Sequence, residues 1–154
     1  MTPYDKIYDA FLAKILEDEW ANWDETDPTS AAEGLADMRQ DLKAILDAAV
    51  PRFKFPRLPL TRDEEAECFT EDLNNEEIQI LACYMKCEWL NRNILTWENV
   101  KPLYEERDFS QANLLKEFNA TLEKEKKNAK ELEALYYRSI NYKPFDFGRL
   151  ASQC

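Results

Sequence analysis

The residues most able to do chemistry in this chain are four cysteines and many carboxylates, and no histidine accompanies them. Cys83 and Cys87 lie four residues apart in an apolar run, while Cys68 and Cys154 stand alone, so no CxxC pair is available for zinc. A helix would place Cys83 and Cys87 on one face, where buried free thiols are the expected state. We therefore expect no metal site and a reducing folding compartment.

Paired carboxylates could act as general acids and bases or bind a hard cation. The candidate pairs lie in predicted polar faces, caps or loops, where solvated charge is the expected state: Glu17/Asp18, Glu64/Glu65, Glu76/Glu77 and Glu105/Glu106. A helical di-iron site needs histidine beside its carboxylates, and a serine or cysteine nucleophile needs a histidine base. The sequence also has no glycine-rich phosphate loop and no nucleophile elbow. We expect that the chain is not an enzyme and binds no cofactor.

Composition predicts one mainly helical domain, because two glycines and seven prolines in 154 residues leave little material for hairpins. The formal net charge of −11 is concentrated in residues 1–50, where 12 acidic and 4 basic side chains give a net of −8. Such a surface disfavours nucleic-acid binding by phosphate neutralisation. The N-terminus resembles no signal peptide, and no apolar run approaches the length of a membrane span. We expect neither a leader nor a membrane helix.

Helical periodicity defines the N-terminal part of the chain. Thr2-Pro3-Tyr4-Asp5 combines a capping residue, a proline and an acid, which predicts a helix start. An apolar stripe at helical spacing then continues through residues 4–20. Residues 24–29 are polar and predict a loop. A capping box at residues 30–33 predicts a second helix that ends before Pro51.

A second capping box, Asn74 with Glu77, predicts the start of a third helix. This helix is apolar around most of its girth through residue 95, so it should be the central one. Residues 67–69 favour a short extended piece before it. Residues 96–107 predict a turn or short helix after it, interrupted by a proline.

The last helix is predicted over residues 108–140, starting at a capping box. Its apolar side chains follow a heptad-like seam: Leu115, Phe118, Leu122, Ala129, Leu132 and Tyr136. The charged run at residues 123–127 interrupts this seam and puts Glu125 at the next seam position. We expect the packing to thin or open to solvent there.

Two segments lack an evident local partner. Residues 52–60 alternate apolar and basic residues with prolines between them, which predicts an extended or edge-strand segment; it is either a connector that covers the core or a contact with another polypeptide. The end of the chain, residues 141–154, either docks on another chain or folds back over its own helices. The predicted partner-binding residues are Arg52, Phe53, Lys54, Phe55, Arg57 and Leu58 in the first segment and Tyr142, Phe145, Phe147 and Leu150 in the second.

The run FTEDLNNEEIQILA at residues 69–82, closed by EWL at 88–90, and the run DFSQANLL at 108–115, followed by a charged helix ending at 132–137, are packing and capping patterns. In this order they resemble the head–tail connector (adaptor) proteins of tailed bacteriophages, over about residues 52–139. The resemblance implies a helical subunit that assembles as a ring, expected to be a dodecamer, beneath the portal protein. It also implies that the ring carries the stopper or tail protein.

The patterns together predict a mainly α fold, a helical bundle of about four to five helices with a short extended or β segment near residues 52–60 and an extended C-terminal tail. Residues 1–140 should form a single helical domain and residues 141–154 a docking tail. The resemblance implies a virion structural protein, made in the host cytoplasm, whose ring lines a channel through which DNA passes without specific binding.

The alternative interpretation is a small acidic regulatory protein of phage type that inhibits a host protein by mimicking DNA. Such a protein would present carboxylates spaced like phosphates on one exposed face. Here the carboxylates are spread over several predicted helices, which disfavours the mimic.

Overall fold

The computed structural model describes residues 1–15, 28–100 and 109–141 of the chain, and in these ranges it is mainly helical. Its four helices are α1 (Tyr4–Ile15), α2 (Pro28–Ala49), α3 (Asn75–Val100) and α4 (Phe109–Asn141), and a 3-10 turn, η2 (Val50–Arg52), follows α2. Three short strands complete it: β1 (Thr2–Pro3), β2 (Arg62–Asp63) and β3 (Cys68–Phe69). The predicted mainly α fold of about four to five helices is confirmed.

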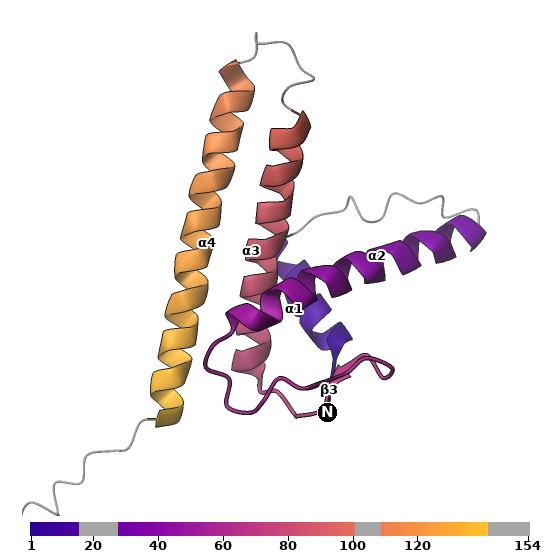
Figure 1. Cartoon of the computed structure of the whole chain (residues 1–154), viewed down its shortest axis with the longest axis vertical. Coiled ribbons are helices and arrows are strands. Elements are labelled where there is room, and N and C mark those ends of the chain that lie inside the picture. Colours follow the sequence, from indigo (N-terminus) through magenta and orange to yellow (C-terminus); the bar gives the residue numbers. More distant parts are fainter. Residues whose placement is uncertain (16–27, 101–108, 142–154) are drawn as a thin grey trace, which may run out of the picture.

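Helix α3 is the central element, as its apolar girth predicted. It packs against α1, α2 and α4, and each of those three helices makes its main contact with α3. Figure 1 shows α3 and α4 running side by side in opposite directions, while α2 crosses α3 and its first half extends away from the other helices. The outer helices therefore bury one side each, whereas α3 is covered on several sides. The exposed side chains of α3 over residues 75–96 gather near its two ends, at Asn75, Glu76, Arg92, Leu95 and Thr96.

The core is one continuous cluster that joins the helices to strand β3. Its largest fully buried side chains include Tyr4, Phe11, Leu42, Phe69, Leu81 and Met85. The rings of Tyr4 and Phe69 meet edge to face with their centroids 5.3 Å apart, which ties the start of α1 to β3. Each such side chain contributes about 1.5–3 kcal/mol to folding by leaving water. The apolar stripe predicted from residue 4 is thus confirmed as core over the described residues of α1.

The helix start predicted in Thr2-Pro3-Tyr4-Asp5 is confirmed at Tyr4, but the predicted capping role of Thr2 is wrong, because Thr2 and Pro3 form strand β1. This strand pairs antiparallel with β3, with Thr2 opposite Phe69, in a sheet of order β1-β3-β2. The hydroxyl of Thr2 accepts a hydrogen bond from the amide of Leu73 at 2.8 Å and donates to the carbonyl of Glu71 at 3.3 Å. The Thr2 hydroxyl oxygen, which would have capped α1, thus accepts the Leu73 amide instead, and the helix begins at Tyr4.

Replacing Thr2 with valine should cost about 1–2 kcal/mol of unfolding free energy, because valine keeps the shape and leaves the buried Leu73 amide without an acceptor. Urea unfolding would measure the change. Thr70→Val is the matched control, since its hydroxyl is exposed and donates to the Thr61 carbonyl at 3.3 Å; we expect less than about 0.5 kcal/mol there. Equal losses in the two variants would contradict this role for Thr2.

The capping box that predicted α3 is confirmed atom by atom. The amide of Asn74 donates to the Glu77 carboxylate at 2.9 Å, and the amide of Glu77 donates back to the Asn74 side chain at 2.8 Å. The helix then continues through Val100, so of the turn or short helix predicted from residue 96, residues 96–100 are helical and belong to α3 itself. The remainder of that predicted turn, 101–107, lies outside the described residues.

The other predicted elements are placed with small shifts. Helix α2 begins at Pro28, before the predicted box at residues 30–33, because proline suits the first turn of a helix. The extended piece predicted at residues 67–69 is strand β3. Helix α4 matches its predicted span closely, although the capping residue proposed for it, at position 108, lies outside the described residues.

Of the two outcomes predicted for the α4 seam at Glu125, opening to solvent is wrong, whereas thinner apolar packing is confirmed, since no buried hydrophobic side chain lies between Leu122 and Ala129 in this described part of α4. The Lys86 ammonium lies 3.1 Å from the Glu125 carboxylate, and their side chains are only 22% and 19% exposed. Further along, Leu132 is 37% exposed, whereas Glu133 is only 5% exposed and takes the seam position. A straight helix repeats every 3.6 residues, so the buried face drifts away from a strict heptad.

Residues 50–61, which join α2 to β2, are called the connector below. The connector begins with η2 and continues along an extended, irregular path without strand pairing. The predicted extended segment near 52–60 is therefore present, while the strand itself follows at β2.

Candidate partner-binding surface

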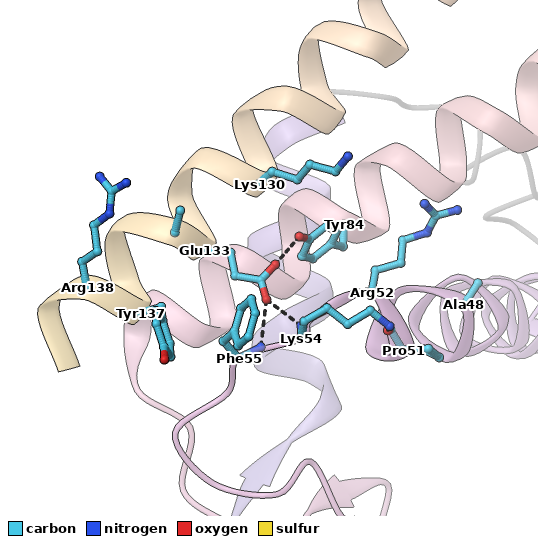
Figure 2. Close-up of a pocket in the computed structure, with 11 residues that line it drawn as sticks. Ala48, Pro51, Arg52, Lys54, Phe55, Tyr84, Lys130, Glu133, Tyr137 and Arg138 are labelled. Atoms are coloured by element: carbon cyan, nitrogen blue, oxygen red, sulfur yellow. Dashed lines mark hydrogen bonds between the residues drawn. The ribbon is translucent and has the colours of Figure 1, made fainter. Parts of the chain in front are cut away.

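The connector is held against α4 by a buried carboxylate. One oxygen of Glu133 accepts hydrogen bonds from the backbone amides of Lys54 at 2.6 Å and Phe55 at 2.9 Å. Its other oxygen accepts the hydroxyl of Tyr84, which comes from α3 (Figure 2). Three donors from two other parts of the chain thus converge on one side chain that is almost fully buried. The two amide hydrogen bonds to Glu133 hold the connector in place of the strand pairing that it lacks.

A second buried carboxylate holds the other end of the same segment. Glu77, on α3, is 0% exposed. One of its oxygens accepts the Arg57 amide at 3.1 Å and the hydroxyl of Tyr136, which comes from α4. Its other oxygen completes the capping box with the Asn74 amide, and the Arg57 guanidinium lies 3.9 Å away.

The two sites are related crosswise, and we call them the crossed Glu–Tyr pairs. Glu77 of α3 binds Tyr136 of α4, while Glu133 of α4 binds Tyr84 of α3. Burial raises the pKa of both tyrosines, and the hydrogen bonds to the carboxylates raise it further. Both hydroxyls therefore stay protonated donors throughout the physiological pH range.

The expectation that the paired carboxylates are solvated is confirmed for Glu64, Glu65 and Glu76 and is wrong for Glu77. The pairs at 17–18 and 105–106 lie outside the described residues. Glu77 was predicted to be an exposed cap residue, and it is both a cap and a buried anchor.

The burial of Glu133 was not predicted. Glu133 lies four residues after Ala129 and three residues before Tyr136, and this spacing, which places all three on one helical face, was a usable signal. A buried carboxylate requires several donors, and their assembly from distant segments could not be read from local sequence.

The predicted partner-binding residues of the connector separate into inner and outer ones. Phe53 is 4% exposed and packs edge to face on Tyr136, with ring centroids 6.0 Å apart, so it belongs to the chain's own core and is not available to a partner. Phe55, by contrast, is 53% exposed and stacks at a tilt on Tyr137 with centroids 4.8 Å apart. Leu58 is half-buried. The connector thus covers the core with one phenylalanine and presents the other.

The basic residues of the connector are exposed, and each has a partner within the chain. Arg52 pairs with Glu88, and Lys54 donates to the Pro51 carbonyl at 2.6 Å. Arg57 donates to the Asp72 carbonyl at 3.1 Å. The four predicted binding residues of the C-terminal tail, Tyr142, Phe145, Phe147 and Leu150, lie outside the described residues.

A cavity of about 890 Å³ opens between the connector and α4, and we call it the basic groove (Figure 2). Four cations and an aromatic pair are prominent in its lining: Arg52, Lys54, Lys130, Arg138, Phe55 and Tyr137. The one carboxylate in this lining, Glu133, already accepts three hydrogen bonds. The groove is therefore positively charged with an apolar wall, on a chain whose net charge is −11.

The last turns of α4 also present apolar side chains to solvent, which we call the apolar end of α4. Its members and their exposed fractions are Leu132 37%, Leu135 60%, Tyr137 46% and Ile140 42%. A smaller cavity of about 360 Å³ lies between this end and the start of α3, lined by Leu132, Leu135 and Ile80 among others. Leu132 and Leu135 thus lie on one flank of α4, and Tyr137 lies on the flank that lines the basic groove. Several exposed apolar side chains at one end of a helix favour a protein interface.

Within the part of the chain that the structure describes, no three histidine, cysteine or carboxylate side chains gather as a metal site would require. None of the helices in those same ranges has the length and hydrophobicity needed to cross a bilayer. Comparison of the chain with protein-family models, curated proteins and solved structures found no match in any of the three. The surface itself is therefore the basis for a functional proposal.

The thiols of Cys68, Cys83 and Cys87 are free and buried, as predicted for the last two. Burial raises the pKa of Cys83, and it raises the pKa of Cys87 to about 11. Because only the thiolate reacts, we expect all three to resist iodoacetamide in the folded protein at pH 8 and to react after unfolding. Peptide mass spectrometry would score each thiol. Similar labelling in the folded and unfolded chains would contradict the buried arrangement.

Proposed function

We propose that this chain is a non-enzymatic structural subunit, a head–tail connector of a tailed bacteriophage that assembles as a ring between portal and tail. The observation that carries the proposal is that the C-terminal part of α4 presents two surfaces on an acidic chain, the basic groove on one flank and exposed leucines on the other. Exposed apolar side chains supply contact area, and a charged groove supplies orientation. The resemblance of residues 52–139 to connector proteins supports the same proposal.

The construction of the surface suits repeated assembly. The connector is irregular, yet its backbone is anchored at Lys54, Phe55 and Arg57 by the two buried glutamates. A surface that is fixed before binding loses less conformational entropy when a partner arrives. The charge distribution also differs between faces, which favours head-to-tail contacts over symmetric ones. Head-to-tail contacts form a ring when the rotation between successive copies closes on itself.

The proposed ring is a dodecamer that docks on the portal protein on one side and on a stopper or tail protein on the other. Its acidic N-terminal part would face the channel, where like charge keeps a DNA duplex from adhering as it passes. The work of the protein is then mechanical, and it requires neither cofactor nor catalytic residue.

Negative-stain electron microscopy of the purified chain, alone and mixed with the portal protein encoded by the same genome, tests this proposal. Rings that form alone or on the portal are the expected result. A chain that stays monomeric and does not bind portal would overturn it. Capture of a host nucleic-acid-binding protein in place of virion proteins would favour the DNA-mimic alternative.

A further inference from the structure

Two cations at the ends of the basic groove have no ion-pair partner among the described residues. Lys130 and Arg138 lie eight residues apart on α4, about 12 Å along the helix axis. In Figure 2, Lys130 reaches over the side of the groove where Arg52 lies, and Arg138 is directed outward at the opposite end. These two positive charges are thus available to an incoming group, unlike those of Arg52 and Lys54.

The first half of α2 presents the complementary feature. Glu33 and Asp37 are exposed, and neither has a hydrogen-bond or ion-pair partner in the described part of the chain. They lie four residues apart and therefore share one helix face, which Asp41 continues. Asp41 pairs with Arg92 at 3.1 Å, and both side chains are solvent-exposed, so the pair contributes little and remains open to exchange. From Glu33 to Asp41 the acidic face spans eight residues, the same length as from Lys130 to Arg138.

The acidic face of α2 has no route to the groove of its own chain. Ala48, near the end of α2, lines that groove, and Glu33 lies 15 residues earlier on the same helix, about 22 Å away. Figure 1 shows that this first half of α2 extends away from the other helices. A continuous helix holds the two features apart, so they meet only between different molecules.

We propose that the basic groove of one copy receives the acidic face of α2, carried by Glu33 and Asp37, from a second copy of this chain. The inference deepens the proposed function and rests on it, since it assigns the subunit contact of the ring. The contact joins different patches on the two copies, so it is a head-to-tail contact that propagates around a ring. The aromatic pair Phe55 and Tyr137 forms the apolar wall beside the charges.

Charge exchange tests the contact directly. The variants Lys130→Glu with Arg138→Glu, and Glu33→Lys with Asp37→Lys, should each weaken self-association by about tenfold or more, because like charges then face each other. Combining all four substitutions in one chain should restore most of the lost affinity. Sedimentation velocity over a concentration series would measure this. Lys127→Glu with Glu117→Lys changes exposed charges elsewhere on α4 and should leave association unchanged.

Circular dichroism of every variant separates lost association from lost folding. Folded single-set variants without rescue in the combined chain would overturn the contact, as would a wild-type chain that stays monomeric at every concentration. If all variants form rings on the portal protein, the groove contact is rejected and the connector function is retained. If the exchange restores self-association and the chain does not bind the portal protein, the connector function is rejected and the groove contact is retained.

Discussion

Replacing Glu77 with alanine should lower the free energy of unfolding by about 3–5 kcal/mol, one of the largest effects expected from a single substitution in this chain. The reason is that three donors lose their acceptor together: the buried hydroxyl of Tyr136 and the partly buried amides of Asn74 and Arg57. Each unsatisfied buried donor costs about 1–3 kcal/mol, and water entering the space relieves part of that cost. Urea unfolding followed by circular dichroism would measure the loss.

Glu76→Ala is the matched control, because Glu76 is exposed in the same first turn of α3. It should cost less than about 1 kcal/mol, the usual value of an acid near a helix start. Similar losses in the two variants would show that Glu77 acts only through the helix end, and the buried anchor would then be rejected.

The two anchors should differ when glutamine replaces glutamate. In Glu133→Gln, the remaining carbonyl oxygen still accepts the amides of Lys54 and Phe55, while the new amide group can donate to the Tyr84 oxygen. In Glu77→Gln, either orientation turns a donor toward a backbone amide. We expect the Glu77 variant to be the less stable, and the reverse order would contradict the crossed arrangement.

Introducing charge at the apolar end of α4 should weaken assembly without unfolding the protein. Leu132→Glu with Leu135→Glu removes two partly exposed leucines, whose further burial in an interface contributes about 1.5–3 kcal/mol together, so ring formation and portal binding should weaken at least about tenfold. Leu135 is 60% exposed and Leu132 37% exposed in the single chain, so circular dichroism of the variant must show that it is folded. Electron microscopy and sedimentation would report the loss of rings.

Ala120→Glu with Asn119→Glu is the control for this variant, since it adds the same two charges at exposed positions on the same helix. It should assemble like the wild type. Rings of unchanged size and stability in the double leucine variant would exclude the apolar end of α4 from the subunit and portal contacts.

Local signals predicted the helices well, because the residues that cap a helix lie within a few positions of its ends. The pairing of Asn74 with Glu77 located the start of α3 to the residue, and its apolar girth identified it as the central helix. The buried thiols of Cys83 and Cys87 followed from the same helical spacing. In each case the interacting groups lie within one or two turns of each other.

Features that depend on distant segments could not be predicted in this way. Thr2 resembled a helix cap, and its oxygen binds the Leu73 amide, 71 positions away. Glu133 is held by donors 49 to 79 positions away along the chain. Both phenylalanines of the connector were predicted to bind a partner. Phe53 faces inward because the path of the connector brings it against Tyr136, and that contact could not be predicted locally.

The most direct test of the proposed assembly is the accessibility of the apolar end of α4 in its functional setting. A Leu135→Cys variant in a Cys154→Ser background would be labelled with a maleimide, first as the isolated chain and then within rings on the portal protein. Leu135 is 60% exposed in the single chain, so rapid labelling is expected there, with at least about tenfold slower labelling in the assembly. Equal rates in the two states would mean that other polypeptides do not cover this surface, and the proposal would be contradicted.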